Sequence, residues 1–358
     1  MSRYSRHIVL DEIGQAGQDK ISAAKVLVIG AGGLGCPVLQ YLVAAGIGKI
    51  GVVDYDTVDE SNLQRQVLYN TASIGQKKVI AAKERLQQLN PTITIETYPE
   101  KLVSENVIEI FKDYDIIVDG TDNFSTRYLI NDAAIILDKP LVYGAIFKFE
   151  GQVTVFNYKG GPSYRCLFPT PPQKGSVPNC SEIGVLGVLP GIIGTMQANE
   201  VLKIILGIGT PLSGKLYCFN TLTNQSMTIG INREEPTIAM VKQRGLNFEN
   251  IEETTFCSNN AFEIGIESII SEDDIQFIDV RGLSEMPRIE REDILEIPLP
   301  QLTKRLELIS RKKKIIIFCK SGIRSAQAVA ILKEQNITNC WSLKDGVSAF
   351  TKALSKTT

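Results

Sequence analysis

The sequence predicts an α/β protein with two domains, each built around a largely parallel sheet. Short β-branched runs alternate with helical stretches in residues 25–145, which is the pattern of a doubly wound sheet. The alternation begins again near residue 262, after a charged, Asn-rich segment that has no periodicity. At 358 residues the chain is also longer than one compact core usually supports.

Five apolar runs of the first domain are expected to form buried parallel strands, because they are rich in β-branched residues. They are residues 26–29, 50–53, 93–95, 116–118 and 141–143. Helices are expected at 38–45, 78–89 and 127–137. Three further runs, 152–157, 215–220 and 225–231, alternate apolar and polar side chains, which predicts an antiparallel extension of this Rossmann-like sheet.

The second domain is expected to be a smaller α/β unit. Its predicted strands are 277–280, 315–318 and 339–343, and its predicted helices are 302–308 and 325–333. We interpret 236–260 as a linker, which places the two domains at 1–235 and 261–358. Residues 160–182 are rich in Pro and Gly and are expected to form a long exposed loop.

Composition excludes several classes of function. A net charge of −2 gives no reason to expect nucleic acid or an acidic membrane as a partner. Residues 183–199 carry no charge, but their glycines, Pro190 and polar side chains favour a helix in a core or subunit interface over a membrane span. The seven scattered cysteines and the polar start of the chain predict a cytoplasmic protein. His7, the sole histidine, is expected to be an exposed imidazole.

A glycine-rich turn follows the first expected strand and opens the first expected helix. Its four glycines, Gly30, Gly32, Gly33 and Gly35, let backbone N–H groups and the helix dipole approach phosphate oxygens. Asp54 ends the next strand, where a carboxylate usually holds ribose hydroxyls. These features alone fit an NAD enzyme equally well.

Five polar residues favour ATP with magnesium over a dinucleotide. They are Asn62, Arg65, Gln66, Lys78 and Asp122. Breaking an α–β phosphoanhydride builds negative charge on the bridging oxygen, which Arg65 and Lys78 would stabilise. Asp122 follows a strand at the carboxyl edge of the sheet, and is the candidate Mg²⁺ ligand. Each residue taken singly is also explained as a surface charge or a helix cap, so the prediction rests on the combination.

With these residues the chain resembles the MoeB/ThiF adenylyltransferases, relatives of ubiquitin-activating enzymes. The resemblance covers residues 3–232 and includes Arg3-Tyr4-Ser5-Arg6, the glycine turn, Asp54-Tyr55-Asp56, Asn62-Leu63-Gln64-Arg65-Gln66, Gly75-Gln76-Lys77-Lys78, Thr121-Asp122-Asn123 and Tyr164-Arg165-Cys166. It implies ATP-dependent adenylylation of the C-terminal Gly-Gly carboxylate of a small ubiquitin-like sulfur carrier.

The resemblance also implies roles for single residues. Asp54 would bind ribose, Asp122 would take magnesium, and the residues that contact the phosphates would be Asn62, Arg65 and Lys78. Asp56, Gln66 and Asn123 lie in the same motifs and are counted with the nucleotide site. Arg6 would reach the phosphates from the other subunit of a homodimer, and the uncharged helix after Pro190 would pack in the dimer core.

The chain departs from this family at its structural zinc site, which is often held by two Cys-x-x-Cys pairs. Here the first pair reads Ser163-Tyr164-Arg165-Cys166, and no second pair follows in residues 228–260. Four thiolates are needed to close such a site, and only Cys166 matches. We therefore expect no structural zinc and interpret Cys166 as a buried thiol.

Cys319 begins a second candidate site, in the loop Cys319-Lys320-Ser321-Gly322-Ile323-Arg324 between a strand and a helix. Such a loop curls its amides around the sulfur, and the helix dipole together with Arg324 is expected to lower the pKa of Cys319. The same environment would stabilise a persulfide anion. Tyrosine phosphatases have a longer loop and a preceding histidine, so phosphate chemistry is disfavoured.

This loop resembles that of a rhodanese domain covering 262–355, supported by Asp279-Val280-Arg281 and Asp345-Gly346-Val347-Ser348-Ala349-Phe350. The segment 281–298 is short and lacks the usual His-Ile-Pro-Gly, so a degenerate, purely structural rhodanese is the alternative. Cys180 occupies the position of the first family's loop cysteine, and by that resemblance it would form a transient acyl or persulfide link. The alternative for Cys180 is a tolerated surface thiol.

The sequence therefore predicts an adenylyltransferase with sulfurtransferase activity that converts a carrier's carboxylate into a thiocarboxylate. Its catalytic candidates are Arg6, Arg65, Lys78, Cys180, Cys319 and Arg324. The carrier belongs to molybdopterin, thiamine or related sulfur metabolism, and the donor is a cysteine desulfurase or thiosulfate. Two alternatives stay open: an adenylating enzyme without sulfur transfer, such as a tRNA dehydratase relative or a carrier-conjugating enzyme, and a non-catalytic NAD-binding or scaffold protein.

Overall fold

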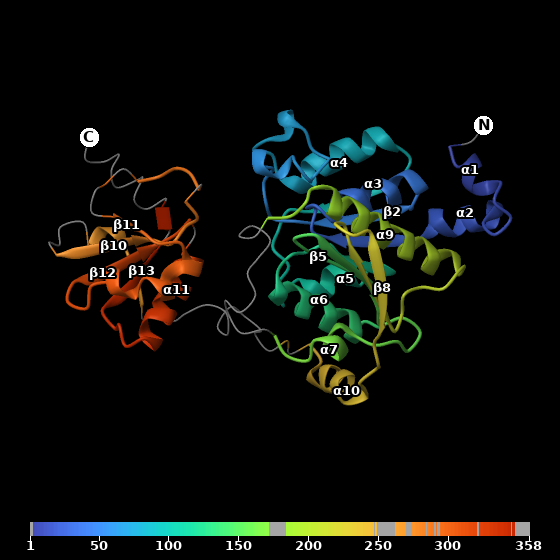
Figure 1. Ribbon diagram of the computed structural model, residues 1–358. Coiled ribbons are helices and arrows are strands. Elements are labelled where there is room, and N and C mark those ends of the chain that lie inside the picture. The colour runs from blue at the N-terminus through green and yellow to red at the C-terminus, as the bar shows by residue number, and fades with distance from the viewer. Residues whose placement is uncertain are drawn as a thin grey trace. The chain divides into compact units, whose positions relative to one another are not determined.

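The computed structural model describes residues 3–171, 184–246, 248, 262–269, 274–283, 285–289, 291, 294–320, 322–344 and 346–347. Those up to 248 form one compact unit, and those from 262 onward form a second (Figure 1). Each unit has a sheet of its own.

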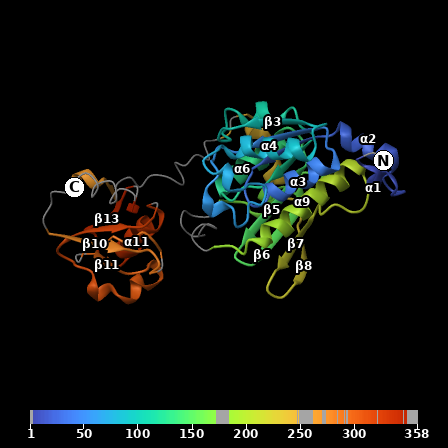
Figure 2. The same cartoon turned by 90° about the horizontal axis from the view of Figure 1, so that it is seen from above.

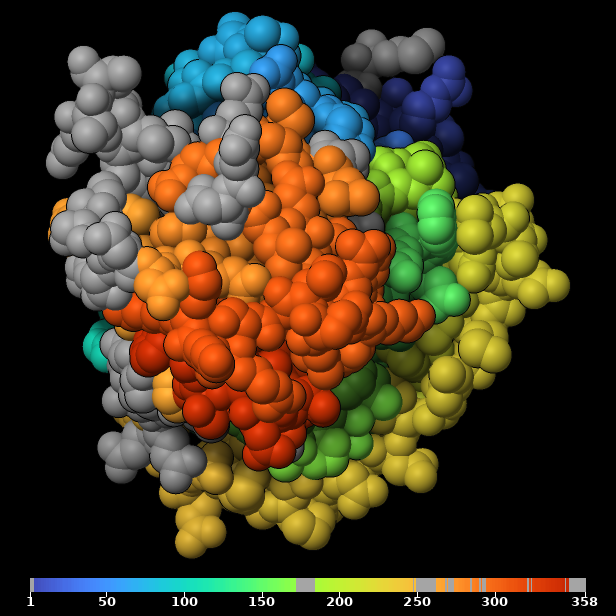
Figure 3. Space-filling model, turned by 60° about the vertical axis from the view of Figure 1, so that its left-hand side comes forward, coloured from blue at the N-terminus to red at the C-terminus, as the bar shows by residue number. Residues whose placement is uncertain are grey.

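The sheet of the first unit is doubly wound, as predicted. Its strands are β1 Lys25–Ile29, β2 Lys49–Val53, β3 Thr94–Tyr98, β4 Ile116–Asp119, β5 Leu141–Phe147, β6 Glu150–Phe156, β7 Lys215–Asn220 and β8 Gln225–Gly230. They lie in the order β3-β2-β1-β4-β5-β6-β7-β8. The pairs from β3 to β5 are parallel, and those from β5 to β8 are antiparallel, which confirms the predicted extension. Every residue of β8 is exposed, and Figure 3 shows this part of the chain in yellow on the outer surface.

Helices cover both faces of this sheet (Figure 1, Figure 2). They are α1 Ser5–Ile8, α2 Gly14–Ala23, α3 Gly35–Ala45, α4 Lys78–Leu89, α5 Val107–Phe111, α6 Phe124–Ile136, α7 Tyr164–Leu167, α9 Val188–Leu206 and α10 Glu235–Arg244, with short 3₁₀ turns η1 Glu60–Asn62 and η2 Thr71–Ser73. Val26 and Val28 of β1 join a core with α3, α4 and α9, whereas Leu27 and Ile29 join a second core with α5 and α6. Burial on both faces explains why the strands read as continuous apolar runs.

The uncharged segment forms most of α9. This helix packs on α3, β5 and β6 through buried residues such as Leu189, Ile193 and Val201. Burial in the unit's own core explains why these positions are apolar. Among the described residues, no helix combines the length and the hydrophobicity that crossing a membrane requires.

The structure differs from the predicted linker at its start. Helix α10 occupies residues that the sequence assigned to the linker, and it packs on α6 and α7. Only Ile238 and Val241 are buried, against Ile135 of α6. Two buried positions in ten residues leave too weak a periodicity to be recognised in the sequence.

The second unit holds a five-stranded sheet in the order β11-β10-β12-β13-β9, in which every pair is parallel. Its strands are β9 Glu263–Ile264, β10 Ile275–Asp279, β11 Ile294–Glu296, β12 Lys314–Phe318 and β13 Cys340–Leu343, and its long helix is α11 Ile323–Glu334. The helix predicted at 302–308 is wrong. Two 3₁₀ helices, Leu299–Lys304 and Leu306–Leu308, meet there at Arg305, whose φ of −128° is incompatible with a continuous helix.

A buried ion pair joins α6 to α7 in the first unit. Arg165 Nε and Nη2 each lie 2.7 Å from a carboxylate oxygen of Asp132, and the Arg165 guanidinium stacks over the Tyr128 ring at 4.7 Å. The side chains are 4% and 7% exposed. A bidentate pair of this kind offsets the cost of removing both charges from water.

Removing one partner should therefore be costly. We predict that Asp132→Ala lowers the stability of the first unit by about 3–5 kcal/mol, because it leaves a buried guanidinium without its counter-ion. Differential scanning calorimetry of the full chain measures the change. Glu109→Ala breaks the exposed Lys112–Glu109 pair and should leave the same transition almost unmoved. Equal shifts in the two variants would contradict this assignment.

Candidate active site

The glycine-rich turn lies where the strand order of the first sheet reverses. β1 has β2 on one side and β4 on the other, and ligands of such sheets bind at the carboxyl ends of the strands at this point. Gly30 has a φ of +91°, and a Cβ there would lie 2.7 Å from the carbonyl oxygen of Gly120. A Cβ at Gly35 would lie 1.9 Å from the carbonyl oxygen of Gly30. Both positions therefore require glycine.

Asp54 fixes this turn to the end of β2. The N–H of Ala31 donates to Asp54 Oδ2 at 2.8 Å, and the N–H of Asp56 donates to Oδ1 at 2.9 Å. Burial raises the pKa of Asp54, while the nearby Lys78 acts in the opposite direction. Each carboxylate oxygen keeps a second lone pair, so Asp54 can also accept hydrogen bonds from ribose hydroxyls.

Lys78 begins α4 and is only 6% exposed. Its Nζ donates to Asp56 Oδ2 at 2.9 Å, and its backbone N–H donates to the Asp56 carbonyl at 3.0 Å. The buried Tyr69 hydroxyl donates to the Ala31 carbonyl at 2.8 Å and lies 3.3 Å from that of Lys78. Tyr69 thus ties the glycine turn to the start of α4, and burial raises its pKa, which keeps it protonated.

Arg65 and Gln66 border the turn from the side of η1. A Cβ built at Gly33 would lie 3.6 Å from Arg65 Cγ, and one at Gly32 would lie 3.7 Å from Gln66 Nε2. Gln66 is 3% exposed, and its Oε1 has no hydrogen-bond partner among the described residues. Because a buried acceptor without a partner is costly, this amide is suited to a ligand donor.

Asn62 has a local structural role in this state. Its Oδ1 accepts the N–H of Asp59 at 3.2 Å, which closes the capping box of η1. Arg65 Nη1 donates to the Ser61 carbonyl at 3.0 Å, one turn earlier. Both side chains therefore hold the segment that carries Gln66.

Asp122 and Asn123 follow β4, and their side chains differ in what they contact. Asn123 caps α6, since its Oδ1 accepts the N–H of Thr126 at 2.9 Å. Asp122 is exposed, and its carboxylate makes no hydrogen bond or ion pair with any described residue. The pKa of Tyr55 is raised by its burial and also by the charges of Asp56, Asp54 and Asp122. Asp122 therefore faces the same region as the carboxylates that follow β2.

Sequence reasoning missed the buried residues that support the end of β4. Arg127 Nη2 donates to the Thr121 carbonyl at 2.7 Å, and its Nε lies 3.8 Å from Asp119 Oδ2. Gln197 Nε2, from α9, donates to the Asp119 carbonyl at 2.7 Å. Burial raises the pKa of Asp119, and Arg127 opposes the rise. Arg127 and Gln197 lie in expected helices, with no local signal that separates them from packing residues.

Arg6 lies away from this site within one chain. It is exposed on α1, whose neighbours Arg3 and Tyr4 bind the far end of α4. Arg3 Nη1 donates to the Leu89 carbonyl at 2.8 Å, and Asn90 Nδ2 donates to the Tyr4 hydroxyl at 2.9 Å. Lys78 begins the same helix, about 18 Å from that end for 12 residues.

Cys166 is half-buried and accepts hydrogen bonds from two backbone groups. The N–H groups of Ser163 and Glu234 each lie 3.3 Å from its Sγ. The described part of the chain contains no cluster of three or more His, Cys, Asp or Glu side chains arranged to hold a metal ion. The Cys166 sulfur thus connects the start of α7 to the segment before α10.

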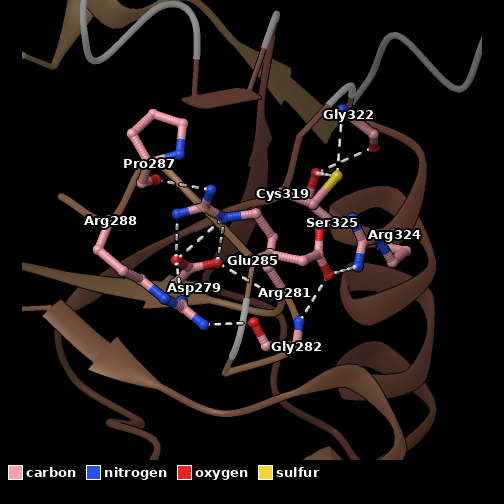
Figure 4. A network of polar contacts seen from close by, with 10 residues as sticks. All are labelled: Asp279, Arg281, Gly282, Glu285, Pro287, Arg288, Cys319, Gly322, Arg324 and Ser325. Atoms are coloured by element: carbon pink, nitrogen blue, oxygen red, sulfur yellow. Dashed lines mark hydrogen bonds and ion pairs between the residues drawn. The ribbon is translucent and has the colours of Figure 1, made fainter. Parts of the chain in front are cut away.

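Cys319 lies in a closed loop between β12 and α11 of the second unit (Figure 4). The N–H of Gly322 donates to Cys319 Sγ at 3.2 Å, and Ser325 Oγ lies 3.6 Å from the same sulfur. Gly322 has a φ of +88°, which turns the loop back toward the cysteine. A Cβ at Gly346 would lie 2.2 Å from the Cys319 carbonyl oxygen, so the close packing of this residue on the loop requires a second glycine.

Arg324 differs from its expected arrangement. Its Nη1 and Nη2 lie 2.5 and 2.8 Å from the two carboxylate oxygens of Glu285, a residue that sequence reasoning did not select. The ion pair with Arg324 lowers the pKa of Glu285 to about 2. The guanidinium is thus bound to a carboxylate and does not act on Cys319 as an uncompensated charge. Cys180, the other predicted sulfur-handling residue, lies outside the described residues.

Known proteins match both units. Residues 4–239 match the ThiF family, and residues 266–353 match the rhodanese-like domain. A sulfur carrier protein adenylyltransferase of Thermus thermophilus is 49% identical over 72% of this chain and 96% of its own. A probable adenylyltransferase/sulfurtransferase MoeZ of Mycobacterium tuberculosis is 37% identical over 99% and 93%.

Other relatives agree with these. The adenylyltransferase and sulfurtransferase MOCS3 of Anopheles gambiae is 38% identical over 99% of this chain and 87% of its own. A crystal structure of E. coli MccB with ATP superposes with a TM-score of 0.58 at 22% identity, over 65% of this chain and 72% of that one, and so shares the fold. The matches over both units show that the chain belongs to the ThiF family of adenylyltransferases, in the form that carries a C-terminal rhodanese-like domain.

Proposed function

We propose that this protein adenylylates the C-terminal Gly-Gly carboxylate of a small ubiquitin-like sulfur carrier and then converts it into a thiocarboxylate. One observation carries the proposal: a single chain combines a polar nucleotide site at the switch point with a cysteine loop in a rhodanese-like unit. The first unit alone supports adenylylation. The second unit supplies the sulfur chemistry that a carrier-conjugating or dehydratase-like enzyme would not need.

The first step is attack of the carrier's carboxylate oxygen on the α-phosphorus of ATP, with pyrophosphate leaving. The glycine turn and Asp54 would hold the phosphates and the ribose, and Gln66 would accept a hydrogen bond from the nucleotide. Lys78 and Arg65 would stabilise the charge that develops on the bridging oxygen. Asp122 fits Mg²⁺, which favours one or two carboxylates together with phosphate oxygens and neutralises phosphate charge when bound.

The second step places sulfur on the activated carbonyl. Cys319 thiolate takes sulfane sulfur from a donor, such as a cysteine desulfurase persulfide or thiosulfate, and becomes a persulfide. The terminal sulfur attacks the acyl carbon and AMP leaves. Cys180 thiolate then attacks Cys319 Sγ, which releases the carrier thiocarboxylate and leaves a Cys180–Cys319 disulfide for a cellular thiol to reduce. The carrier would belong to molybdopterin, thiamine or related sulfur metabolism.

Two further features belong to the proposal. Arg6 is exposed and far from the site of its own chain, so we assign it to the phosphates of a second copy in a homodimer. The chemistry needs Cys319 as a free thiol, and the described cysteines are all unpaired. A reducing cytoplasm meets that requirement.

Two adjacent lysines offer a matched test of the nucleotide site. We predict that Lys78→Ala reduces carrier-dependent ATP–pyrophosphate exchange on the order of 100-fold, because Lys78 is buried and we assign its ammonium to the phosphates. Lys77→Ala should stay near the wild type, since Lys77 is exposed and its Nζ donates to the Tyr55 carbonyl at 2.6 Å. Exchange that falls equally in both variants, with the fold intact by circular dichroism, would count against the assignment.

Intact mass spectrometry of the carrier tests the sulfur step. With Mg-ATP and thiosulfate, the wild type should convert the carrier to a species heavier by the replacement of one oxygen with sulfur. Cys319→Ala should abolish that gain and keep pyrophosphate exchange, whereas Cys218→Ser, at a half-buried thiol on β7, should change neither. Full thiocarboxylate production by Cys319→Ala would favour an adenylating enzyme without rhodanese chemistry.

We also propose that the fold needs no structural zinc, because the Cys166 sulfur accepts hydrogen bonds from two backbone N–H groups. Elemental analysis should find zinc well below one ion per chain, and a chelator should leave the melting temperature unchanged. Cys166→Ser should have the same zinc content and melting temperature as the wild type, since a hydroxyl also accepts hydrogen bonds from N–H groups. One zinc per chain that is lost in Cys166→Ser would overturn this prediction.

A further inference from the structure

Glu285 connects the segment after β10 to the loop of Cys319. Its carboxylate binds Arg324 through both oxygens, and its Oε1 also accepts the N–H of Gly282 at 2.8 Å. Figure 4 shows the carboxylate facing the Arg324 guanidinium beside the Cys319 loop. The side chains of Arg324 and Glu285 are 17% and 34% exposed, so solvent screens the pair only in part.

A second, more deeply buried network fixes the position of Glu285. Asp279 Oδ2 accepts Arg281 Nη2 at 2.7 Å and Arg288 Nη1 at 2.8 Å. Arg281 Nη1 donates to the Pro287 carbonyl at 2.9 Å, and Arg288 Nη2 donates to the Gly282 carbonyl. These bonds hold the backbone on both sides of Glu285. Glu285 thus lies between two residues, Gly282 and Pro287, whose carbonyls are both bound by this network.

The pair survives throughout the neutral range. Arg324 holds the pKa of Glu285 near 2, below its value of 4.5 in an unfolded chain. A depressed carboxyl pKa means that the interaction is fully present above about pH 4.5 and is lost as the pH falls through about 2. At the pH of sulfur transfer, Arg324 is therefore always accompanied by a negative charge.

We infer that Glu285 is a positioning residue that sets how strongly the Cys319 loop favours highly charged sulfur donors. The inference rests on the proposed sulfur transfer. In loading, Cys319 thiolate attacks the sulfane sulfur of thiosulfate; the new S–S bond forms, the old one breaks, and sulfite leaves with the electron pair. Glu285 compensates the cation that would attract the dianion and holds its guanidinium in one orientation. A donor with less charge is affected less.

Two donors with the same reaction and different charge test this inference. Thiosulfate is a dianion, methanethiosulfonate is a monoanion, and each delivers one sulfane sulfur that cyanide accepts as thiocyanate. Glu285→Gln should raise the ratio of kcat/KM for thiosulfate to that for methanethiosulfonate by about fivefold, and added salt should shrink the change. Damage to folding alone would lower both rates and leave their ratio unchanged.

Two further variants make the result specific. Asp274→Asn removes an exposed carboxylate that lies 3.1 Å from Lys313 Nζ in the same unit, and it should leave the ratio at the wild-type value. In an Arg324→Gln background there is no guanidinium left to orient, so Glu285→Gln should change the ratio by less than it does in the wild type. Glu285→Asp, which restores the charge, should restore the ratio.

The outcomes separate this inference from the proposed function. A donor ratio that is unchanged in Glu285→Gln, or that shifts equally in Asp274→Asn, overturns the role of Glu285 and leaves sulfur transfer intact. A wild-type protein that transfers sulfur from neither donor, with no persulfide at Cys319 by mass spectrometry, overturns the proposed function and this inference with it.

Discussion

The nucleotide site depends on the close approach of Gly30 to Gly120, where β1 and β4 end side by side. A single methyl group at Gly30 would meet the Gly120 carbonyl at 2.7 Å and force the two strand ends apart. Because they meet, the carboxylates after β2 and the carboxylate after β4 face the same region. Arg65 and Gln66, which follow η1, and Lys78 at the start of α4 border the same region, so polar groups from four segments lie around the carboxyl ends of β1 and β4.

The sequence predicts those features that depend on nearby residues alone. The glycines of the turn are demanded by local backbone geometry, and Lys78 begins a helix whose apolar periodicity is clear. The parallel strands are buried on both faces, so their composition also reveals them. The sequence leaves two roles open for Asp122, as a metal ligand or as a helix cap. The structure gives the cap to Asn123, because the Asn123 side chain accepts the Thr126 N–H.

The sequence does not predict the roles of several other residues, because the groups that they bind are distant in the sequence. Tyr69 binds the Ala31 carbonyl across 38 positions, and Gln197 binds the Asp119 carbonyl across 78. Glu285 and Arg324 are 39 positions apart, so the sequence indicated a free guanidinium near Cys319 where the structure has an ion pair. The sequence does not predict helix α10, because its only two buried side chains are too few to form a helical apolar pattern.

The Lys78–Asp56 pair has a consequence for the enzyme between turnovers. Burying an ammonium group without a counter-ion lowers the stability of the folded protein. Asp56 occupies that place within the chain, and its carboxylate is half exposed. In the proposed reaction, a triphosphate would replace Asp56 as the anion at Lys78 Nζ. The Lys78 ammonium is therefore compensated by Asp56 within the chain itself, without a bound nucleotide.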